Sequence, residues 1–543
     1  MRHGILGGTF DPIHTGHIEI ALAAKRQFDL QMLWFMPAKI PPHKQNSDIT
    51  DDVHRLMMVQ HSIPSDEAEM NVMEFAREGV SYTSDTLTML KNEHPDAEIY
   101  YIMGEDSLRD FPKWHEPEKI AKLAKIAVAI REESVESFRE LLAERNEQYG
   151  GAFIPLTIPY QPISSTMLRE ALAAGEEPLY LAPRAYRYIR RFGLYDTVST
   201  AIRPETKKLY DYFVPKLREK LSPHRFRHCT GVAHLAADLL QEYAEVNCTP
   251  DADGYYTIVQ QGYIAGLLHD CAKYMPFDTY PDFCREHGIS FGKETEASPE
   301  VLHANVGRYL AEHTYGIKDE TILRAIEVHC VGGIDMDEVS MAVYTADFCE
   351  PFRDHRPLLC SLQNIRDLAY QDLTKAALLV TDCALTFIKS NNYSVDSRTE
   401  LVLENLQKKA GVNTRKEETK MDNYTSKDLA MTAYAALDSK KAFDIRVIQI
   451  DKVSTIADYF VIADGNNSSQ VEAMVDEVQM MFHKKYDLDP KRIEGAKNSG
   501  WILLDYGDIV VHVFSSQDRL FYDLERVWRD GAVVDTEGWN TEA

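Results

Sequence analysis

Short apolar runs alternate with amphipathic stretches over the N-terminal third of the chain. Strand-like runs occur at residues 33–38, 98–104 and 126–130, and residues 18–28 carry apolar side chains at helical spacing. Strands that alternate with helices favour a parallel sheet covered by helices. We therefore predict an α/β domain with a parallel sheet for residues 1–198.

A different pattern occupies residues 203–410. Helical periodicity dominates there, as in residues 232–245, 263–273 and 306–316, and strand signals are scarce. This pattern predicts an all-α domain. The polar, aperiodic stretch that follows, residues 411–424, predicts a linker.

The last segment, residues 425–543, mixes both periods. It predicts a small α/β domain, with helices at 428–442 and 469–486 and strands at 444–451, 459–465, 501–507 and 508–514. Three domains agree with a length of 543 residues, given about 150 residues per domain. The fold class is thus multidomain: α/β, then all-α, then small α/β.

Composition narrows the classes of function. The net charge of -26 is spread evenly and includes no basic cluster, so we expect no direct DNA binding. No apolar run reaches the roughly 18 residues that a membrane span requires. The eight cysteines form no C-x-x-C pair, which argues against a disulfide framework or a zinc ribbon. A reducing cytoplasm is the expected setting.

A glycine-rich turn followed by two histidines is the first candidate site. Gly7 and Gly8 follow a predicted strand, and His14 and His17 stand at a predicted helix start. Glycines let backbone N–H groups approach phosphate oxygens, and a helix N-terminus adds partial positive charge. Two imidazoles beside such a cradle suit phosphoryl or nucleotidyl transfer. The alternative is an ordinary glycine turn with two surface histidines.

The whole string GGTFDPIHTGH resembles the signature of the HxGH nucleotidylyltransferases, and the first domain looks like nicotinate mononucleotide adenylyltransferase. The segments PPHK, SYTSDTL, MGEDSLRDFPKW and ISSTMLRE follow in family order. The resemblance implies a Rossmann-like fold and adenylyl transfer from ATP to nicotinate mononucleotide, with Mg²⁺ on the triphosphate and pyrophosphate as the leaving group. It implies catalytic roles for His14, His17, Lys44 and Arg169. The implied ATP- and substrate-binding residues are Gly8, Thr9, Phe10, His43, Thr83, Asp106, Trp114, Ser164, Ser165 and Thr166.

The helical domain carries dispersed residues of metal-ligand type. A buried histidine or aspartate needs a partner, and a metal ion satisfies several at once. Nitrogen and carboxylate ligands favour iron, manganese or a similar metal over a thiolate-type site. Six ligands can hold two ions, with Asp270 as the natural bridge, although any one of them alone could be an ordinary core or surface residue. The candidate ligands are His228, His269, Asp270, His303, His329 and Asp347.

The His269-Asp270 doublet and the order of the flanking ligands resemble the HD phosphohydrolase superfamily. The segments LLHDCAK and TADFCEPFRDH resemble its YqeK-type members, which implies symmetrical hydrolysis of diadenosine tetraphosphate to ADP. Lys273 would be a phosphate or acid partner, and Arg353 would bind substrate phosphate. HANVG and HCVGG depart from the family pattern beside the pocket, so hydrolysis of another nucleotide such as (p)ppGpp stays open. A regulatory or scaffolding role without catalysis is the other alternative.

The C-terminal domain shows no metal-spaced histidine cluster, nucleophile elbow or phosphate loop. Two long segments, residues 444–478 and 500–528, resemble the ribosomal silencing factor family. The resemblance implies binding to a large-subunit ribosomal protein and a block on subunit joining. An aromatic-rich face is typical of protein interfaces, although some of its members could instead belong to the core. The implied ribosome-binding residues are Tyr506, Phe521, Tyr522, Leu524 and Trp528.

Overall fold

The predicted alternation of strands and helices produces a parallel sheet at the N-terminal end of the chain. Its strands follow the order β3-β2-β1-β4-β5-β6, and every pairing is parallel. The order reverses between β1 and β4, so the carboxyl ends of these two strands form a topological switch point. The strands are β1 (Arg2–Gly8), β2 (Met32–Pro37), β3 (Glu69–Met70), β4 (Glu98–Gly104), β5 (Lys125–Ala129) and β6 (Phe153–Leu156).

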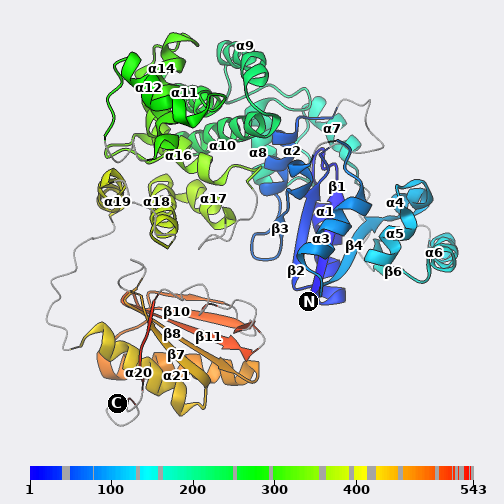
Figure 1. Cartoon of the computed structure of the whole chain (residues 1–543). Helices are drawn as coiled ribbons and strands as arrows, with labels where there is room; N and C mark the ends of the chain where they lie inside the picture. The colour runs from blue at the N-terminus through cyan, green and yellow to red at the C-terminus, as the bar shows by residue number, and fades with distance from the viewer. Residues whose placement is uncertain are drawn as a thin grey trace. The chain divides into compact units, whose positions relative to one another are not determined.

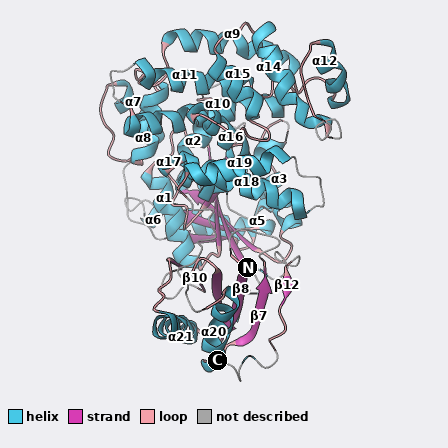
Figure 2. Ribbon diagram, turned by 90° about the vertical axis from the view of Figure 1, so that its left-hand side faces the viewer, coloured by secondary structure: helices cyan, strands magenta, loops and turns pink. Residues whose placement is uncertain are grey.

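Helices pack around this sheet because parallel strands bury both of their faces. Ile5 on one face of β1 and Leu6 on the other belong to two separate apolar clusters. Figure 2 shows the sheet with helices beside it. The helices of this region are α1 (Thr15–Phe28), α2 (Asp52–Gln60), η2 (Met73–Ala76), α3 (Thr83–Glu93), α4 (Glu105–Asp110), η3 (Phe111–Lys113), α5 (Pro117–Leu123), α6 (Val135–Tyr149), α7 (Ser165–Ala173) and α8 (Pro183–Phe192).

The middle of the chain is helical, as its periodicity predicts. Helices α10 and α11 pack along each other, and α16 lies against both (Figure 1). The helices are α9 (Pro204–Lys220), α10 (Pro223–Asn247), α11 (Asp253–Leu268), η5 (Phe277–Thr279), α12 (Tyr280–Glu286), η6 (Pro299–Leu302), α14 (His303–His313), α15 (Glu320–Val328), α16 (Glu338–Cys349), α17 (Leu362–Gln371), α18 (Leu373–Ser390) and α19 (Ser397–Lys409).

The structure is a computed structural model, and it divides into two compact units. The first comprises Met1–Thr381 and Asp396–Ala410, and the second comprises Asp382–Val395 and Gly411–Ala543. The residues described are 1–39, 49–77, 79–129, 135–156, 163–248, 253–292, 298–353, 362–390, 397–411, 424–450, 457–495, 500–516, 518–519, 524, 531–536 and 539.

The α/β region and the helical region share the first unit and one apolar core. A single cluster of buried side chains runs from Leu6 in β1 to Leu406 in α19. Polar contacts reinforce it around Asp238 of α10, which is fully buried. Its carboxylate accepts hydrogen bonds from Arg191 Nη1 of α8 at 2.7 Å and from Tyr370 OH of α17 at 2.6 Å. The two predicted domains are therefore packed together through a permanent type of interface.

The second unit contains a mixed sheet with helices on one face. Strand order is β12-β7-β8-β11-β10-β9, and β8 and β11 are parallel. Helices α20 (Ser426–Ser439) and α21 (Ser468–Tyr486) share one apolar cluster with the sheet, and a second, smaller cluster lies apart from it. The strands are β7 (Phe443–Gln449), β8 (Tyr459–Gly465), β9 (Arg492–Glu494), β10 (Trp501–Asp505), β11 (Ile509–Ser515) and β12 (Ala532–Val533).

Two further expectations can be compared with the structure. Among the described residues, no helix combines the length and apolarity that crossing a bilayer would demand. Six cysteines are free thiols, but Cys383 is disulfide-bonded. Cys383 therefore departs from the free thiols that a reducing setting predicts.

Candidate functional site

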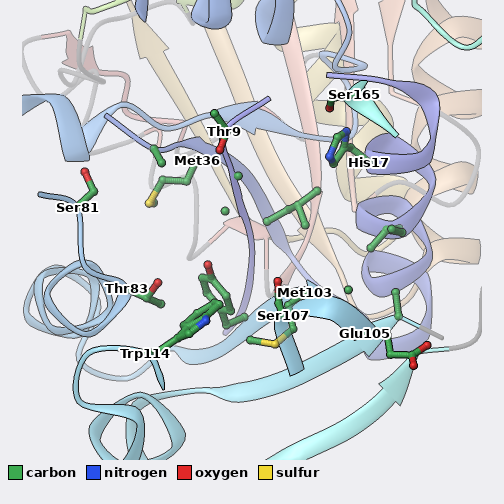
Figure 3. Close-up of a pocket in the computed structure, with 18 of the residues that line it drawn as sticks. Thr9, His17, Met36, Ser81, Thr83, Met103, Glu105, Ser107, Trp114 and Ser165 are labelled. Atoms are coloured by element: carbon green, nitrogen blue, oxygen red, sulfur yellow. The ribbon is translucent and has the colours of Figure 1, made fainter. Parts of the chain in front are cut away.

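A cavity of about 750 Å³ lies at the switch point of the first sheet. Crevices at such points are the usual ligand sites of open α/β sheets. In Figure 3, His17 and Ser165 lie at one end of this cavity, and Thr83 and Trp114 lie at the other. The predicted residues that line it are Gly8, Thr9, His14, His17, Thr83, Trp114, Ser164 and Ser165.

The two predicted histidines lie side by side. The backbone N–H of His14 donates to Nδ1 of His17 at 3.3 Å, and the two ring centroids are 3.8 Å apart. Burial lowers the pKa of His14 to about 4. Burial, with a smaller effect of His14, also holds the pKa of His17 well below its ordinary value. Both rings are therefore neutral at pH 7, and each can donate an N–H to a phosphate oxygen.

A second helix start completes this end of the cavity. Ser164 caps α7, where its hydroxyl accepts a hydrogen bond from the backbone N–H of Met167 at 3.3 Å. Ser165 donates to the carbonyl of Pro12 at 2.9 Å, and Arg169 Nη1 donates to the carbonyl of Asp11 at 2.6 Å. The start of α7 is thus fixed to the glycine-rich loop, where backbone N–H groups favour an anion.

Not every predicted residue of this set lines the cavity. Phe10 is 2% exposed, and its ring packs edge-on against His17 at a centroid distance of 5.2 Å, so it supports His17 from behind. Thr166 and Asp106 are exposed and lie outside the lining, where Glu105 stands in place of Asp106. His43 and Lys44 fall outside the described residues.

The other end of the cavity is aromatic. Tyr101 packs edge-on against Trp114 with ring centroids 6.0 Å apart, and burial raises the pKa of Tyr101 to about 12. Glu74 lines the same end and accepts a hydrogen bond from the Thr86 hydroxyl at 2.9 Å. Burial raises the pKa of Glu74. An aromatic slot with few polar groups suits a flat heterocycle.

Sequence reasoning missed Arg55, whose side chain is 1% exposed. Its Nη1 donates to the carbonyl of Thr9 at 2.9 Å and to the carbonyl of Ala38 at 2.8 Å, and its Nε donates to the carbonyl of Thr50 at 3.1 Å. The guanidinium therefore fixes the glycine-rich loop to α2. The only sequence signal was an arginine among apolar residues at helical spacing.

The six predicted metal ligands converge in the helical region. His228 Nε2 lies 3.1 Å from His269 Nε2 and 2.9 Å from Asp347 Oδ1. On the other side, His303 Nε2 lies 3.0 Å from His329 Nε2. The residues come from α10, the ends of α11 and α15, the start of α14, and α16. We call this set the metal-ligand cluster.

Asp270 lies between the two halves of the cluster. Its Oδ2 is 3.6 Å from the Nε2 atoms of His228 and His269, whereas its Oδ1 is 3.4 Å from His303 Nε2 and 3.5 Å from His329 Nε2. One carboxylate thus faces both histidine pairs. Asp270 would be the residue shared by the two histidine pairs if each pair held a cation.

The residues fit a metal pair on chemical grounds. Nδ1 of His269, His303 and His329 each faces a backbone carbonyl, at 2.7, 2.5 and 2.7 Å. This contact places the proton on Nδ1 and leaves the Nε2 lone pair free, as second-shell partners do in metal sites. Two Nε2 lone pairs 3.0 Å apart repel each other, and a bound cation would relieve that repulsion. Burial lowers the pKa of His303 to about 3.

Cationic side chains surround the cluster. Lys273 Nζ lies 3.1 Å from Asp270 Oδ1, Arg225 Nη1 lies 2.8 Å from Asp270 Oδ2, and Arg353 Nη2 lies 3.2 Å from Asp347 Oδ1. Lys273 and Arg353 were predicted, and Arg225 was not. Three cations beside a histidine and carboxylate cluster suit a polyanionic substrate.

The predicted ribosome-binding residues fare differently. Tyr506 is 3% exposed and packs against Phe482 of α21 at a ring centroid distance of 4.2 Å. The expectation that it belongs to a surface face is therefore wrong, because α21 covers that side of the sheet. Leu524 packs against the second apolar cluster. Phe521, Tyr522 and Trp528 lie outside the described residues.

Comparison with known proteins matches each region to a family. The family model described as cytidylyltransferase-like matches residues 5–171, the HD domain model matches residues 225–351, and the model "Ribosomal silencing factor during starvation" matches residues 423–543. These matches confirm the three expected resemblances. The expected fold class, α/β followed by all-α and a small α/β domain, is also confirmed.

Individual relatives cover parts of the chain. A probable nicotinate-nucleotide adenylyltransferase of Thermomicrobium roseum is 38% identical over 209 residues, which cover 38% of this chain and 97% of the relative. The nicotinate-nucleotide adenylyltransferase of Bacillus subtilis is 36% identical over 36% of this chain and 98% of its own length. A solved structure from Clostridium acetobutylicum, described as a predicted HD superfamily hydrolase involved in NAD metabolism, is 30% identical with a TM-score of 0.33, covering 37% of this chain and 97% of that one.

Proposed function

Through its N-terminal region this chain belongs to the nicotinate-nucleotide adenylyltransferase family, and on that premise we propose how its residues serve the reaction and what the other two domains do. In the transfer, a phosphate oxygen of nicotinate mononucleotide attacks the α-phosphorus of ATP, and the bond to the β-phosphate breaks to release pyrophosphate. The observation that carries the residue roles is the two-ended nucleotide cavity, with neutral histidines at one end and an aromatic slot at the other.

In this proposal the triphosphate lies between the glycine-rich loop and the start of α7. His14 and His17 donate N–H groups to its oxygens, and Arg169 adds a charged fork beside Thr166. Mg²⁺ bound to the triphosphate would neutralise charge. Trp114 and Thr83 hold the pyridine ring of the mononucleotide, and Lys44 and His43 approach its phosphate. Incubating the chain with ATP and either nicotinate or nicotinamide mononucleotide tests the assignment, since deamido-NAD should form faster.

For the helical domain we propose metal-dependent symmetrical hydrolysis of diadenosine tetraphosphate to two ADP. The bridging position of Asp270 between two histidine pairs carries this proposal. His228, His269 and Asp347 would hold one ion, and His303 and His329 the other, with iron or manganese as the expected metals. Bound metal would activate water and neutralise phosphate charge. Lys273, Arg225 and Arg353 would orient the polyphosphate.

Product analysis tests the hydrolase proposal. The full-length chain, supplied with Mn²⁺ or Fe²⁺, should convert diadenosine tetraphosphate to ADP alone. AMP and ATP as products would contradict symmetrical cleavage, and preferential hydrolysis of (p)ppGpp would support the rival substrate. A His329→Ala variant should be inactive, whereas His313→Ala, at an exposed position on α14, should keep its activity. If the wild-type chain binds no metal, that result would support a scaffolding role for the helical domain.

The C-terminal unit supports a second function, which we propose to be silencing of ribosomes through a protein of the large subunit. The family match over residues 423–543 carries this proposal, and ribosome and nucleotide substrates together favour the cytoplasm. Leu524 and the undescribed Phe521, Tyr522 and Trp528 are the candidate contacts, without Tyr506. Full-length chain should co-sediment with isolated large subunits and reduce their joining with small subunits. A Leu524→Asp variant should weaken co-sedimentation, and unchanged pelleting would count against this face.

A further inference from the structure

A second, smaller cavity opens directly on the metal-ligand cluster. Its volume is about 130 Å³, and its lining includes the ligand His228 with the nearby cations Arg225 and Arg353. The opposite side is formed by Val72, Phe75 and Ala76, in and just before η2. These residues belong to the α/β region, so two domains of the first unit share one cavity. We call Val72, Phe75 and Ala76 the outer wall.

Specific contacts hold the outer wall over the cluster. Arg227, next to the ligand His228, donates from Nη2 to the backbone carbonyl of Phe75 at 3.0 Å. The Phe75 ring meets the Phe352 ring edge-on at a centroid distance of 5.5 Å. Arg227 and Phe352, the two residues that contact the outer wall, lie near the candidate ligands His228 and Asp347 in the sequence. The wall is fixed to the helices that carry the cluster.

The two sides of this cavity differ in chemistry. Arg225 and Arg353 reach the ligand carboxylates and are both about one-third exposed, at 31% and 32%. Guanidinium groups in this position suit phosphate oxygens. The side chains of Val72, Phe75 and Ala76 offer no hydrogen-bonding group. A phosphate group can therefore bind on the inner side, but the outer wall can only limit what stands next to it.

Size limits the ligand further. Pockets that enclose a whole drug-sized ligand occupy roughly 300–1,000 Å³, whereas this cavity measures about 130 Å³. One or two phosphate groups fit that space, and a nucleoside does not. A nucleoside attached to a phosphate that binds beside His228 therefore lies outside this cavity. At least one phosphate must then separate it from the phosphorus beside His228.

We propose that the outer wall, supplied by the adenylyltransferase region, selects the substrates of the HD domain. It admits nucleoside polyphosphates whose attacked phosphorus is at least one phosphate away from the nucleoside, and it excludes nucleoside monophosphates. This inference rests on the proposed hydrolase function and deepens it. In the reaction, water adds its oxygen to that phosphorus, the bridging phosphorus–oxygen bond breaks, and the leaving phosphate keeps the bridging oxygen. One proton of the water stays on the attacked phosphate, and the other passes to the leaving phosphate.

Ala76 offers the sharpest test, because it is exposed and small at the end of η2. In Ala76→Trp the indole should fill the cavity, whereas Ala76→Ser should leave it open. Full-length protein loaded with Co²⁺ would be titrated with inorganic phosphate, and visible absorption of the metal would report binding. Ala76→Trp should require at least about tenfold more phosphate than wild type or Ala76→Ser, a loss within reach of one bulky side chain. Equal Co²⁺ content in all three proteins would show that the cluster is intact.

The outcomes separate the two proposals. Equal phosphate affinity in Ala76→Trp and wild type would overturn the outer wall. A wild-type chain that binds phosphate at the cluster but hydrolyses no dinucleoside polyphosphate would overturn the proposed function and leave the wall standing. If wild type releases phosphate from AMP as fast as it cleaves diadenosine tetraphosphate, the proposed selection is wrong. A rate ratio of at least about a hundredfold against AMP is expected, the size of discrimination that steric exclusion supplies.

Discussion

His61, the residue just after α2, places its Nε2 2.9 Å from Asp238 Oδ2 of α10. This contact joins the adenylyltransferase region to the helix that also carries the candidate metal ligand His228. Both side chains are buried, at 4% and 0% exposure. The Asp238 carboxylate also accepts hydrogen bonds from Arg191 and Tyr370. Burial by itself disfavours the charged carboxylate, yet Arg191 and these donors hold the pKa of Asp238 well below its ordinary value. The interface between the two domains is therefore built around the buried ion pair of Asp238 and Arg191.

The first prediction concerns Asp238→Asn. Removing this charge leaves the buried Arg191 with only the partly exposed carboxylates Glu242 and Glu245. Removing one partner of a buried ion pair costs about 3–5 kcal/mol. The unfolding temperature of the first unit, measured by calorimetry, should therefore fall markedly. In Asp211→Asn, which breaks an exposed pair with Lys207, the loss should stay below about 1 kcal/mol.

The stability of the protein at acidic pH measures the contribution of Asp238 independently. A carboxylate with a depressed pKa stabilises the fold above its unfolded value of 3.8, and this contribution is lost as pH falls from there toward the folded value. The difference in stability between wild type and Asp238→Asn should therefore shrink below about pH 4. A difference that does not change with pH would contradict the role of the buried charge.

His234 predicts a second pH window. This side chain is 3% exposed, and burial lowers its pKa from 6.5 to about 4. Below pH 6.5 the unfolded chain takes up a proton that the folded chain refuses, so stability is lost as pH falls toward 4. Between pH 7 and pH 5 this one group contributes about 2 kcal/mol of that loss.

The variant His234→Gln checks this window. Glutamine can still donate to the Thr230 carbonyl and accept from the Tyr263 hydroxyl, as His234 does. The variant should have a flatter dependence of melting temperature on pH between 7 and 5, measured by calorimetry. His313→Gln, at an exposed site, is the matched control. Parallel curves of melting temperature against pH for wild type and His234→Gln would contradict the lowered pKa of His234 in the folded protein.

A third prediction separates binding from chemistry at the nucleotide cavity. The hydrogen bond from neutral His17 to the transferring phosphate should strengthen as negative charge develops on that phosphate. His17→Ala should therefore lower kcat about 10²–10³-fold. ATP affinity, measured by calorimetry, should change much less, because the loop, α7 and Arg169 still contact the phosphates. Lys25→Ala on the same helix, where Lys25 pairs with Glu67 outside the cavity, should change neither. Equal losses of kcat and affinity would remove the transition-state role.

Motif residues were the part of the sites that the sequence could reveal. His228, His269 and Asp347 each lie in a distinctive string, and their chemistry allows few other interpretations once they are buried together. The parallel sheet and the helical middle were likewise predictable, because periodicity depends on local spacing. Family order then supplied the long-range relation between strings that no local pattern contains.

Contacts between domains could not be predicted in this way. Phe75 and Asp238 are unremarkable in sequence, and their roles depend on partners more than 100 positions away, as with Arg227 and His61. Tyr506 shows the opposite failure. An aromatic residue after a strand is equally suited to a surface or a core, and only the position of α21 decides that it packs on Phe482.

The metal-ligand cluster gives a prediction that requires no substrate. The wild-type chain should bind up to two metal ions, because Asp270 faces both histidine pairs. His303→Ala should lose the ion held with His329 and keep the other, so metal analysis should give about one equivalent per chain. His287→Ala, an exposed histidine outside the cluster, should retain the wild-type content. Loss of all metal in His303→Ala would contradict two separable positions.

The last prediction concerns His512 in the second unit. The ring lies between Phe460 and Trp501, and neither of its nitrogens has a hydrogen-bond partner in the described part of the chain. Burial lowers its pKa to about 3. A polar ring buried without partners costs about 1–3 kcal/mol, and it adds a loss of about 2 kcal/mol between pH 7 and pH 5 because only the unfolded chain binds the proton. His512→Leu should therefore stabilise this unit at pH 7 and more so at pH 5. The stability of this unit can be measured at both pH values from the hydrogen exchange of the β11 backbone amides. His483→Leu, on the exposed side of α21, is the control. A destabilised His512→Leu at pH 5 would show that the imidazole has a partner that stabilises it.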